Sequence, residues 1–574
     1  MTRLILMEDT QDTPVARLLD ALGTVFERRT LTETLSSPED ARDTALILSE
    51  EQLVNAHGRL GSRLKELVCR YRHALLYPFR GTAQGLRALS DCVGGRANAE
   101  PLDGGDEASY FVSTQFPAAG AFGGLQISPA SATTDFRVRI HESRHPIEHI
   151  VSVGDGGLFI RIAFPSSELF VTSSTAVFDV EAEVDANLAA STCFSALVPF
   201  LFFLHHCQAA FWQSSCRGAN WIIDDVNLRP RYGFIDTRAL AAHVDELGSA
   251  VSIAFIPWNC DRTSPEIVDL FRARWPRLSL CIHGCDHVGA EFVTRSLAHA
   301  LSMLAASLDR MRTLKANTGL PHDRVMVFPQ GKFSRTAMDA LRQSDFLAAV
   351  NTELVDDRTG RGVRAAELLR PAITSYGGFP LFLRRKIREP IANFALDLLL
   401  GKPCLVVTHH DDFRDGMQPF VSLVRSLNAL AADLEWTNLE TIVSRTYLTR
   451  TRGTSVDIRL LAASTTLQPT AADGTVGFSK AEPLVDKPFA VSIAGQRVDS
   501  HWQDGTLTFQ RAIGSDLAHI DVTILRPERT PPALRPLRYR AKVTARRYLS
   551  EIRDNYVSTS PWAAAVVKSI RRGH

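Results

Sequence analysis

The chain has 574 residues, a net charge of +1 at pH 7 and 45% hydrophobic residues. This length allows three or four domains with cores of their own. A charge so close to zero excludes a global field that would attract nucleic acid. The nine cysteines are odd in number, scattered and mostly placed within apolar runs. That usage is typical of reduced thiols in the cytoplasm and argues against a disulfide framework.

Neither a signal peptide nor a transmembrane segment is expected. The first apolar residues give way to Glu8 too soon for a signal peptide. The longest apolar stretch, residues 194–204, is about half of a membrane span, and it predicts a buried helix. We therefore expect a cytoplasmic protein.

Residues 1–120 alternate between strand-like and helical runs. The runs lie at 3–7, 13–22, 45–49, 51–71, 73–77 and 84–92. Such alternation with short connections predicts a small doubly wound parallel sheet, a flavodoxin-like α/β module. It carries no glycine-rich phosphate motif, so we expect it to bind a partner or a small ligand without taking part in catalysis.

Residues 121–214 change to a period of two, which is typical of strands. The alternating runs lie at 135–140, 158–164, 169–172 and 176–180, and clusters of Gly and Pro separate them. This pattern predicts a β-rich extension packed against the first sheet. The buried helix at 194–204 follows it.

Residues 215–450 hold the most regular pattern in the chain. Seven strand-like runs occur, mostly with helical runs between them, at 221–223, 251–256, 278–282, 325–328, 347–350, 373–376 and 404–408. Repeats on this scale predict closure into a parallel barrel. In such a barrel the functional groups collect at the C-terminal ends of the strands.

Acidic and imidazole side chains stand at three of these strand ends. The first run ends in Asp224 and Asp225, the third in His283 with His287 four residues later, and the last in two histidines. Two imidazoles and one carboxylate leave a divalent ion with open positions, as a catalytic site requires. Because neighbouring side chains on a strand point to opposite faces, the two carboxylates must lie on a turn for both to reach the site.

The same residues suggest the groups that a hydrolytic reaction needs. A carboxylate beside the metal, here Asp224, can take the proton of the attacking water, and a histidine opposite can protonate the leaving amine. The backbone N–H of Gln330, held between Pro329 and Gly331, can donate to the developing oxyanion.

The order Asp-Asp, His-x-x-x-His, Pro-x-Gly and a late strand that ends in His resembles the polysaccharide deacetylase family. Its NodB-homology domain is a distorted seven-stranded barrel. The resemblance implies that Asp224 is the base and that Asp225, His283 and His287 bind a divalent metal, usually zinc. It places the general acid at His410, or at His409 if the motif shifts by one residue.

The sequence also departs from the family pattern. Val226 replaces the glycine after Asp-Asp, and Val327 and Gln330 stand where the third motif has arginine and tyrosine. The fourth motif retains Asp356 and Asp357 but lacks its tryptophan. The metal ligands are therefore intact, whereas the residues that orient the base have changed. A catalytically lost barrel that binds a glycan or a partner, and a hydrolase of another carbon–nitrogen bond, remain alternatives.

The rest of the chain divides into two parts. Residues 451–526 alternate again and predict a β-sandwich. Residues 527–574 form a basic C-terminal tail, and a helix near 541–554 can lie on an anionic membrane surface or on a partner, although a solvated terminal helix is the favoured interpretation.

These expectations combine into one hypothesis. The fold class is α/β: a distorted (β/α)7 barrel with an N-terminal doubly wound module, a β-rich extension and a C-terminal β-sandwich. The expected function is metal-dependent hydrolysis of an acetyl group on an amino sugar or glycan precursor. The expected partner is that sugar or glycan, and no nucleic acid is expected.

Overall fold

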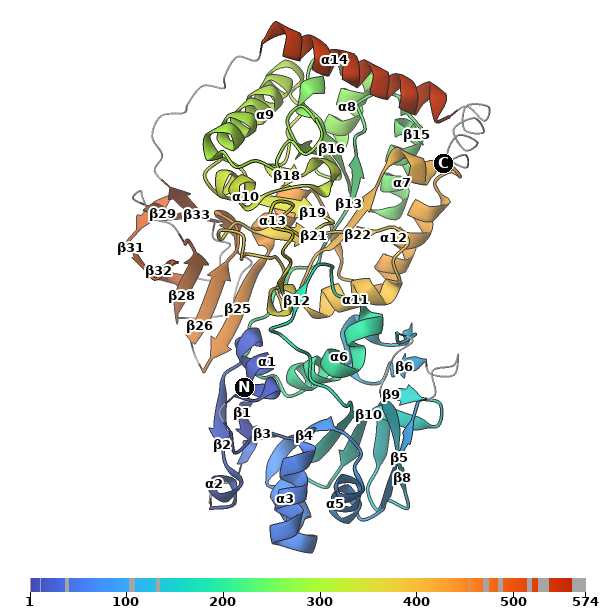
Figure 1. Ribbon diagram of the computed structural model, residues 1–574, viewed down its shortest axis with the longest axis vertical. Coiled ribbons are helices and arrows are strands. Elements are labelled where there is room, and N and C mark those ends of the chain that lie inside the picture. Colours follow the sequence, from blue (N-terminus) through green and yellow to red (C-terminus); the bar gives the residue numbers. More distant parts are fainter. Residues whose placement is uncertain are drawn as a thin grey trace.

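The computed structural model describes residues 2–10, 12–36, 41–102, 109–130, 135–453, 455–467, 474–483, 489–513, 519–524 and 536–559. Of the basic tail expected at 527–574, only residues 536–559 lie in this part of the chain. The described residues form an N-terminal α/β unit, a central barrel and a small β-sandwich beside the barrel (Figure 1). Among them, no helix is both long enough and apolar enough to span a membrane.

The N-terminal unit begins as the doubly wound sheet that the alternation predicted. Its parallel strands run in the order β2 (Phe26–Arg29), β1 (Arg3–Met7), β3 (Ala41–Leu48) and β4 (Tyr71–Phe79). Helix α1 (Pro14–Leu22) packs on one face. The opposite face is covered by α3 (Glu50–Leu60), α4 (Leu64–Cys69) and α5 (Ala83–Val93). Burial on both faces explains why these strands read as continuous apolar runs.

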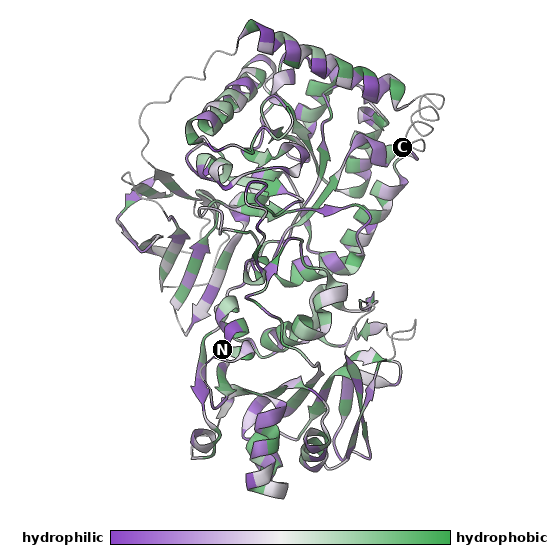
Figure 2. Cartoon of the chain, in the orientation of Figure 1, coloured by the Kyte–Doolittle hydropathy of each residue, from purple (hydrophilic) through white to green (hydrophobic). Residues whose placement is uncertain are grey.

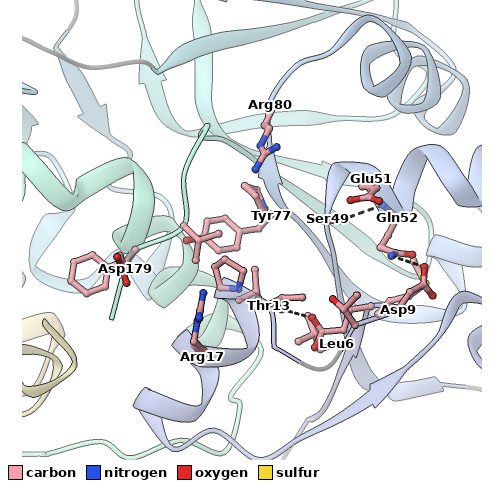
Figure 3. Close-up of a pocket in the computed structure, with 18 of the residues that line it drawn as sticks. Leu6, Asp9, Thr13, Arg17, Ser49, Glu51, Gln52, Tyr77, Arg80 and Asp179 are labelled. Atoms are coloured by element: carbon pink, nitrogen blue, oxygen red, sulfur yellow. Dashed lines mark hydrogen bonds between the residues drawn. The ribbon is translucent and has the colours of Figure 1, made fainter. Parts of the chain in front are cut away.

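A cavity of about 450 Å³ lies at the C-terminal ends of β1, β3 and β4 (Figure 3). Asp9 follows β1, Ser49 follows β3 and Arg80 follows β4, and all three line the cavity. The strand order reverses between β1 and β3, and open α/β sheets bind ligands in the crevice at such a reversal. We therefore expect a small ligand of this module to bind in this cavity.

The β-rich extension continues the first sheet instead of packing against it. Strand β11 (Glu168–Ser173) pairs with β4 in parallel. The sheet reaches eleven strands through β10 (Gly156–Ala163), β9 (Ile147–Val153), β8 (Phe136–His141), β7 (Gln126–Ile127), β6 (Tyr110–Val112) and β5 (Arg96–Pro101). The predicted buried helix is α6 (Ala190–His206), which shares the core of α1 on one face of this sheet. Strand periodicity predicted β8, β10 and β11 correctly, but residues 176–180 form no strand, β9 was not predicted, and the pattern did not specify which edge the strands join.

The central unit confirms the predicted barrel. Its parallel strands follow the order β21 (Leu381–Leu383), β19 (Ala348–Asn351), β18 (Val325–Val327), β17 (Leu278–His283), β16 (Val251–Phe255), β13 (Gly218–Asp224), β23 (Cys404–Thr408) and β22 (Arg385–Lys386). Only Arg384 separates β21 from β22, so the two ends of the sheet meet and close seven strand positions into a barrel. Neighbouring side chains alternate between two separate cores: Ile222 and Ala254 belong to one, Ile223 and Ile253 to the other.

One predicted barrel strand lies elsewhere. Residues 373–376 contribute only an isolated bridge between Ile373 and Leu381, and residues 381–386 take the seventh position. The apolar part of that segment is three residues long and three basic residues follow it, so its pattern did not indicate a strand. The helices around the barrel are α7 (Thr237–Leu247), α8 (Pro265–Arg274), α9 (Leu297–Thr318), α10 (Arg335–Arg342), α11 (Ile391–Leu399), α12 (Gln418–Leu430) and α13 (Leu439–Arg445).

The predicted β-sandwich is present after the barrel. A five-stranded sheet contains β25 (Tyr447–Arg452), β26 (Ser455–Leu460), β28 (Gly474–Ala481), β32 (Thr506–Ile513) and β31 (Ser500–Gln503). The facing sheet contains β27 (Ser464–Thr466), β33 (His519–Ile524), β29 (Phe489–Ile493) and β30 (Gln496–Val498). Buried residues of both sheets form a single core.

Helix α14 (Leu537–Ile552) ends the described chain and crosses the barrel on the side opposite the N-terminal unit (Figure 1). Hydrophilic and hydrophobic residues are mixed along it (Figure 2). Leu537, Leu549 and Ile552 are exposed on it, while Val543 and Arg547 are buried against the barrel. The expected contact of this segment with a membrane or partner stays a prediction.

Candidate active site

The two adjacent carboxylates lie where strand β13 ends. Asp224 is its last residue, and Asp225 adopts a left-handed backbone conformation with φ 71°. Such a conformation costs a residue other than glycine on the order of 1–3 kcal/mol, and strain of this kind gathers at functional sites. The two adjacent carboxylates predicted a turn at this point. The observed turn lets both of them face the same end of the barrel.

Asp225 lies close to two histidines, one at the end of β17, the second strand along from β13, and one in the loop after β17. Its Oδ1 lies 3.4 Å from His283 Nε2 and 2.9 Å from His287 Nε2. The three ligand atoms all lie within 4.8 Å of one another. His283 ends strand β17 and is buried, whereas His287 lies in the following loop with φ 53°. The structure thus brings together the three residues predicted as metal ligands.

A backbone hydrogen bond orients the first imidazole. His283 Nδ1 lies 3.0 Å from the carbonyl oxygen of Val327, the last residue of β18. With its proton donated there, the ring turns the lone pair of Nε2 toward Asp225. Metal-binding histidines usually have such a partner on the other ring nitrogen, which fixes the tautomer and the orientation of the ring.

A buried carboxylate holds the loop between the two histidines. Glu291 accepts hydrogen bonds from the backbone N–H groups of Cys285, Asp286 and Val288, at 2.7, 3.2 and 3.3 Å. Gly284 begins this loop with φ 65°, and a Cβ on it would lie 2.1 Å from Glu291 Oε1. Only glycine therefore allows the carboxylate to approach closely enough to fix the position of His287.

The donor atoms fit a divalent metal ion. Asp225 Oδ1 is buried and makes no well-aligned hydrogen bond, so it is left facing the Nε2 atoms of His283 and His287. Burial raises the pKa of Asp225, but the two imidazoles outweigh burial and hold that pKa well below its usual range. An ionised carboxylate oxygen that faces two imidazole nitrogens is a donor set suited to a zinc-type cation with open positions.

The second carboxylate, Asp224, is held by an arginine that the sequence did not reveal. Arg384 donates hydrogen bonds of 2.7 and 2.6 Å to the two oxygens of Asp224, and both side chains are 4% exposed. Burial raises the pKa of Asp224, but the guanidinium outweighs it and lowers that pKa below its usual value. Arg384 also donates to Thr352 Oγ1 at 3.2 Å. It joins β21 to β22, so closure of the barrel places it beside the site.

The adjacent histidines after β23 lie in different surroundings. His409 Nε2 lies 3.8 Å from Asp224 Oδ2, and its side chain is 57% exposed. The side chain of His410 is only 8% exposed, and its ring packs against Phe234 with Nε2 3.6 Å from Asp554 Oδ1. The structure therefore brings His409, rather than His410, close to Asp224.

Gln330 lies at the same end of the barrel, three residues after Val327, the last residue of β18. Its backbone adopts φ 60°, and its side-chain oxygen accepts a hydrogen bond of 3.4 Å from Ala290 N, in the loop that carries His287. The position is consistent with a backbone donor near the site. The proposed role as an oxyanion donor stays a prediction.

Helix α14 and the residues after it add contacts that no motif indicated. Tyr539 donates a hydrogen bond of 2.7 Å to Asp286, which lies between the two histidines predicted as metal ligands. Arg547 donates to the carbonyl oxygen of His287 at 3.4 Å. Asp554 accepts a hydrogen bond of 3.0 Å from Tyr232 in addition to its contact with His410. These residues lie more than one hundred and forty positions from their partners, and the basic composition of the segment gave no sign of the contacts.

No protein-family model matches the sequence, and no curated protein matches it. Solved structures do match the fold. The chain is similar to Agd3, described as a novel carbohydrate deacetylase, with a TM-score of 0.48 and 10% identity over 91% of this chain and 99% of that chain. It is also similar to a family 4 carbohydrate esterase from Streptomyces lividans in complex with acetate, with a TM-score of 0.23 and 12% identity over 38% of this chain and 90% of that chain.

A further match is BA3943, a family 4 carbohydrate esterase pseudoenzyme from Bacillus anthracis. The TM-score is 0.27 and the identity 8%, over 40% of this chain and 66% of that chain. The structures found thus include carbohydrate deacetylases and family 4 esterases, the group that the motif order resembles. With every one of these TM-scores below 0.5, the likeness says nothing about substrate or turnover.

Proposed function

We propose that the chain is a metal-dependent hydrolase that removes an acetyl group from an amino sugar or glycan precursor. The observation that carries the proposal is the convergence of Asp225, His283 and His287 beside Asp224 at one end of the barrel. A zinc-type ion held by the three ligands would polarise the acyl carbonyl and acidify the attacking water.

Asp224 is the base in this proposal. Its pKa is lowered, so the carboxylate is ionised at neutral pH and can accept a proton from water. The two hydrogen bonds from Arg384 fix the plane of the carboxylate and limit its rotation. As the water oxygen bonds to the carbonyl carbon, the water proton passes to Asp224.

We assign the general acid to His409 instead of His410. His409 is exposed and lies near Asp224, whereas His410 is enclosed by Phe234 and Asp554. When the carbon–nitrogen bond breaks, protonated His409 gives its proton to the leaving nitrogen, and acetate and a free amine result. The backbone N–H of Gln330 remains our candidate donor to the oxyanion.

Metal content and acetate release test this proposal together. Asp225→Ala should empty the metal site and abolish acetate release from N-acetylated amino-sugar oligosaccharides. Asp224→Asn should retain the metal and lose turnover, because it removes the base and no ligand. His243→Ala, on the exposed face of α7, is the matched control and should change neither quantity. Equal metal content in Asp225→Ala and the wild-type protein would refute the ligand assignment.

A barrel that binds a glycan or partner without turnover is the second candidate. Val327 and Gln330 in the third motif favour it, as does the position of α14 over the loops of the site. Bound metal with measurable glycan binding, but no acetate release from any acetylated sugar tested, would favour this candidate. Amine release from a non-sugar amide would favour a hydrolase of another carbon–nitrogen bond.

We place the protein in the cytoplasm on the basis of its cysteines. All nine are free thiols, and seven of them are buried. Burial raises the pKa of the Cys92 and Cys207 thiols to about 12, so these groups are protonated and unreactive. A reducing compartment suits a chain that holds so many unpaired thiols.

A further inference from the structure

A second cluster of two histidines and a carboxylate lies outside the barrel, in the N-terminal unit. His73 comes from β4, Glu168 is the first residue of β11, and His206 is the last residue of α6. Glu168 Oε2 lies 2.9 Å from His73 Nδ1 and 2.8 Å from His206 Nε2. The three ligand atoms lie within 4.8 Å of one another. The arrangement repeats that of Asp225, in which one carboxylate oxygen faces two imidazole nitrogens.

Three rigid elements fix this geometry. His73 and Glu168 are direct partners across the parallel pair β4–β11, so the sheet sets their separation. The His206 ring stacks on Phe116 with a centroid distance of 5.1 Å and lies edge-on to His73 at 5.1 Å. Because no mobile loop supplies a ligand atom, the donors would need little reorganisation to bind an ion.

The electrostatic surroundings favour a cation. Helix α6 ends at His206, and the C-terminal end of a helix carries partial negative charge. Arg161 lies 3.3 Å from the other oxygen of Glu168, but its charge is shared with Glu148 at 2.5 Å. Glu148, Glu168 and Arg161 together carry one net negative charge, and Arg72, which also lines the cavity, offsets it, so the helix end is the contribution that favours a cation. Arg161 contacts Oε1 of Glu168, so Oε2 is the oxygen that faces the two imidazoles.

The cluster also faces open space. His73, Glu168 and His206 line a cavity of about 380 Å³. Its other polar lining comes from Thr2, Arg72, Ser166, Ser167 and Gln208. Further coordination positions would therefore be accessible to water or to an oxygen donor of a small ligand, as in zinc sites with three protein ligands.

We propose that His73, Glu168 and His206 form a second metal site, which binds one divalent transition-metal ion of the zinc type. Two imidazoles and one carboxylate oxygen are a recurrent ligand set for this ion. The site does not depend on the proposed function of the barrel, because it shares no residue with it. Without a metal the same three groups would form only a hydrogen-bonded triad. The experiment must therefore distinguish a bound metal ion from such a triad.

The experiment measures zinc stoichiometry on the full-length protein. The protein is stripped with a chelator, dialysed and reloaded with Zn²⁺ alone, and bound metal is counted by mass spectrometry and titration calorimetry. We expect two zinc ions per chain for the wild-type protein. Glu168→Gln and His206→Gln should each bind one, because both preserve side-chain size and the partly exposed positions tolerate the change. Thermal unfolding should confirm that each variant is folded.

Two comparisons make the result specific. His57→Gln removes a histidine that pairs with Asp91 at 2.8 Å without a third ligand, and it should leave the stoichiometry unchanged. Asp225→Ala should remove the other zinc ion. If Glu168→Gln and His206→Gln bind as much zinc as the wild-type protein, the second site does not exist. If Glu168→Gln and His206→Gln each lose one zinc ion but Asp225→Ala keeps both, the barrel assignment is wrong and the second site stands.

Discussion

Replacing Arg384 by alanine is expected to destabilise the barrel strongly. The guanidinium makes two short hydrogen bonds to Asp224, and both side chains are 4% exposed. Removing one partner of a pair this buried leaves an uncompensated charge and typically costs about 3–5 kcal/mol of unfolding free energy. We expect a loss in that range at pH 7, measured by urea unfolding and followed through the fluorescence of the seven tryptophans, of which Trp221 is buried in β13.

The pH dependence of this loss has a defined sign. Burial raises the pKa of Asp224, but Arg384 lowers it further than burial raises it. A carboxyl whose pKa is lower in the folded state adds stability above its unfolded pKa of about 3.9, and that stability is lost as the pH falls through the folded value. In Arg384→Ala the pKa of Asp224 should rise, because burial is then opposed by His283 and His409 without the guanidinium. The difference in unfolding free energy between the wild-type protein and Arg384→Ala should therefore be largest near neutral pH and should become smaller below about pH 4.

Arg364→Ala is the control, because its side chain is 71% exposed and pairs with Glu181 at the surface. It should cost less than about 1 kcal/mol. The double variant Arg384→Ala/Asp224→Asn should be more stable than the sum of the single losses predicts, since it removes both charges. Losses that add within about 0.5 kcal/mol would show that the two residues do not interact, and would refute the reasoning.

Gly284→Ala should weaken zinc binding at the barrel by about 10–100-fold. A Cβ there would lie 2.4 Å from Pro329 Cγ and would collide with Glu291, whereas Gly289→Ala, which meets nothing, should bind zinc normally. Equal affinities by titration calorimetry would contradict the role given to the loop. Asp554→Asn should slow acetate release and leave zinc content unchanged, because Asp554 contacts His410 and Tyr232 but no metal ligand. Loss of zinc from Asp554→Asn would show that Asp554 also supports the metal site and would contradict this prediction.

The residues predicted as metal ligands could be grouped from the sequence because parallel strands deliver their C-terminal residues to one end of a barrel. Asp224 and Asp225 follow one apolar run and His283 follows another, and both runs were long enough to indicate buried strands. The ligand atoms of these residues and of His287 lie within 4.8 Å in the structure. A local pattern thus placed residues that lie about sixty positions apart in the chain.

Other parts of the site could not be predicted, because no local pattern specifies them. Arg384 lies between a three-residue apolar run and two further basic residues, and its partner Asp224 is 160 positions away. Which of His409 and His410 faces the site depends on where strand β23 ends, since neighbouring side chains point to opposite faces. A shift of one residue exchanges the two histidines, and only the packing of His410 under Phe234 settles their orientation.

Helix α14 makes the candidate site a composite of two distant parts of the chain. Tyr539 contacts Asp286, Arg547 contacts the backbone of His287, and the residue after the helix, Arg553, lies beside Asp554. Each of these contacts falls beside a predicted metal ligand or a histidine, and none of them involves a predicted ligand atom. The barrel therefore carries the predicted donors, while the C-terminal segment restrains the loops around them. We expect metal affinity and turnover to change independently, because the first should depend on barrel residues and the second also on how α14 is packed.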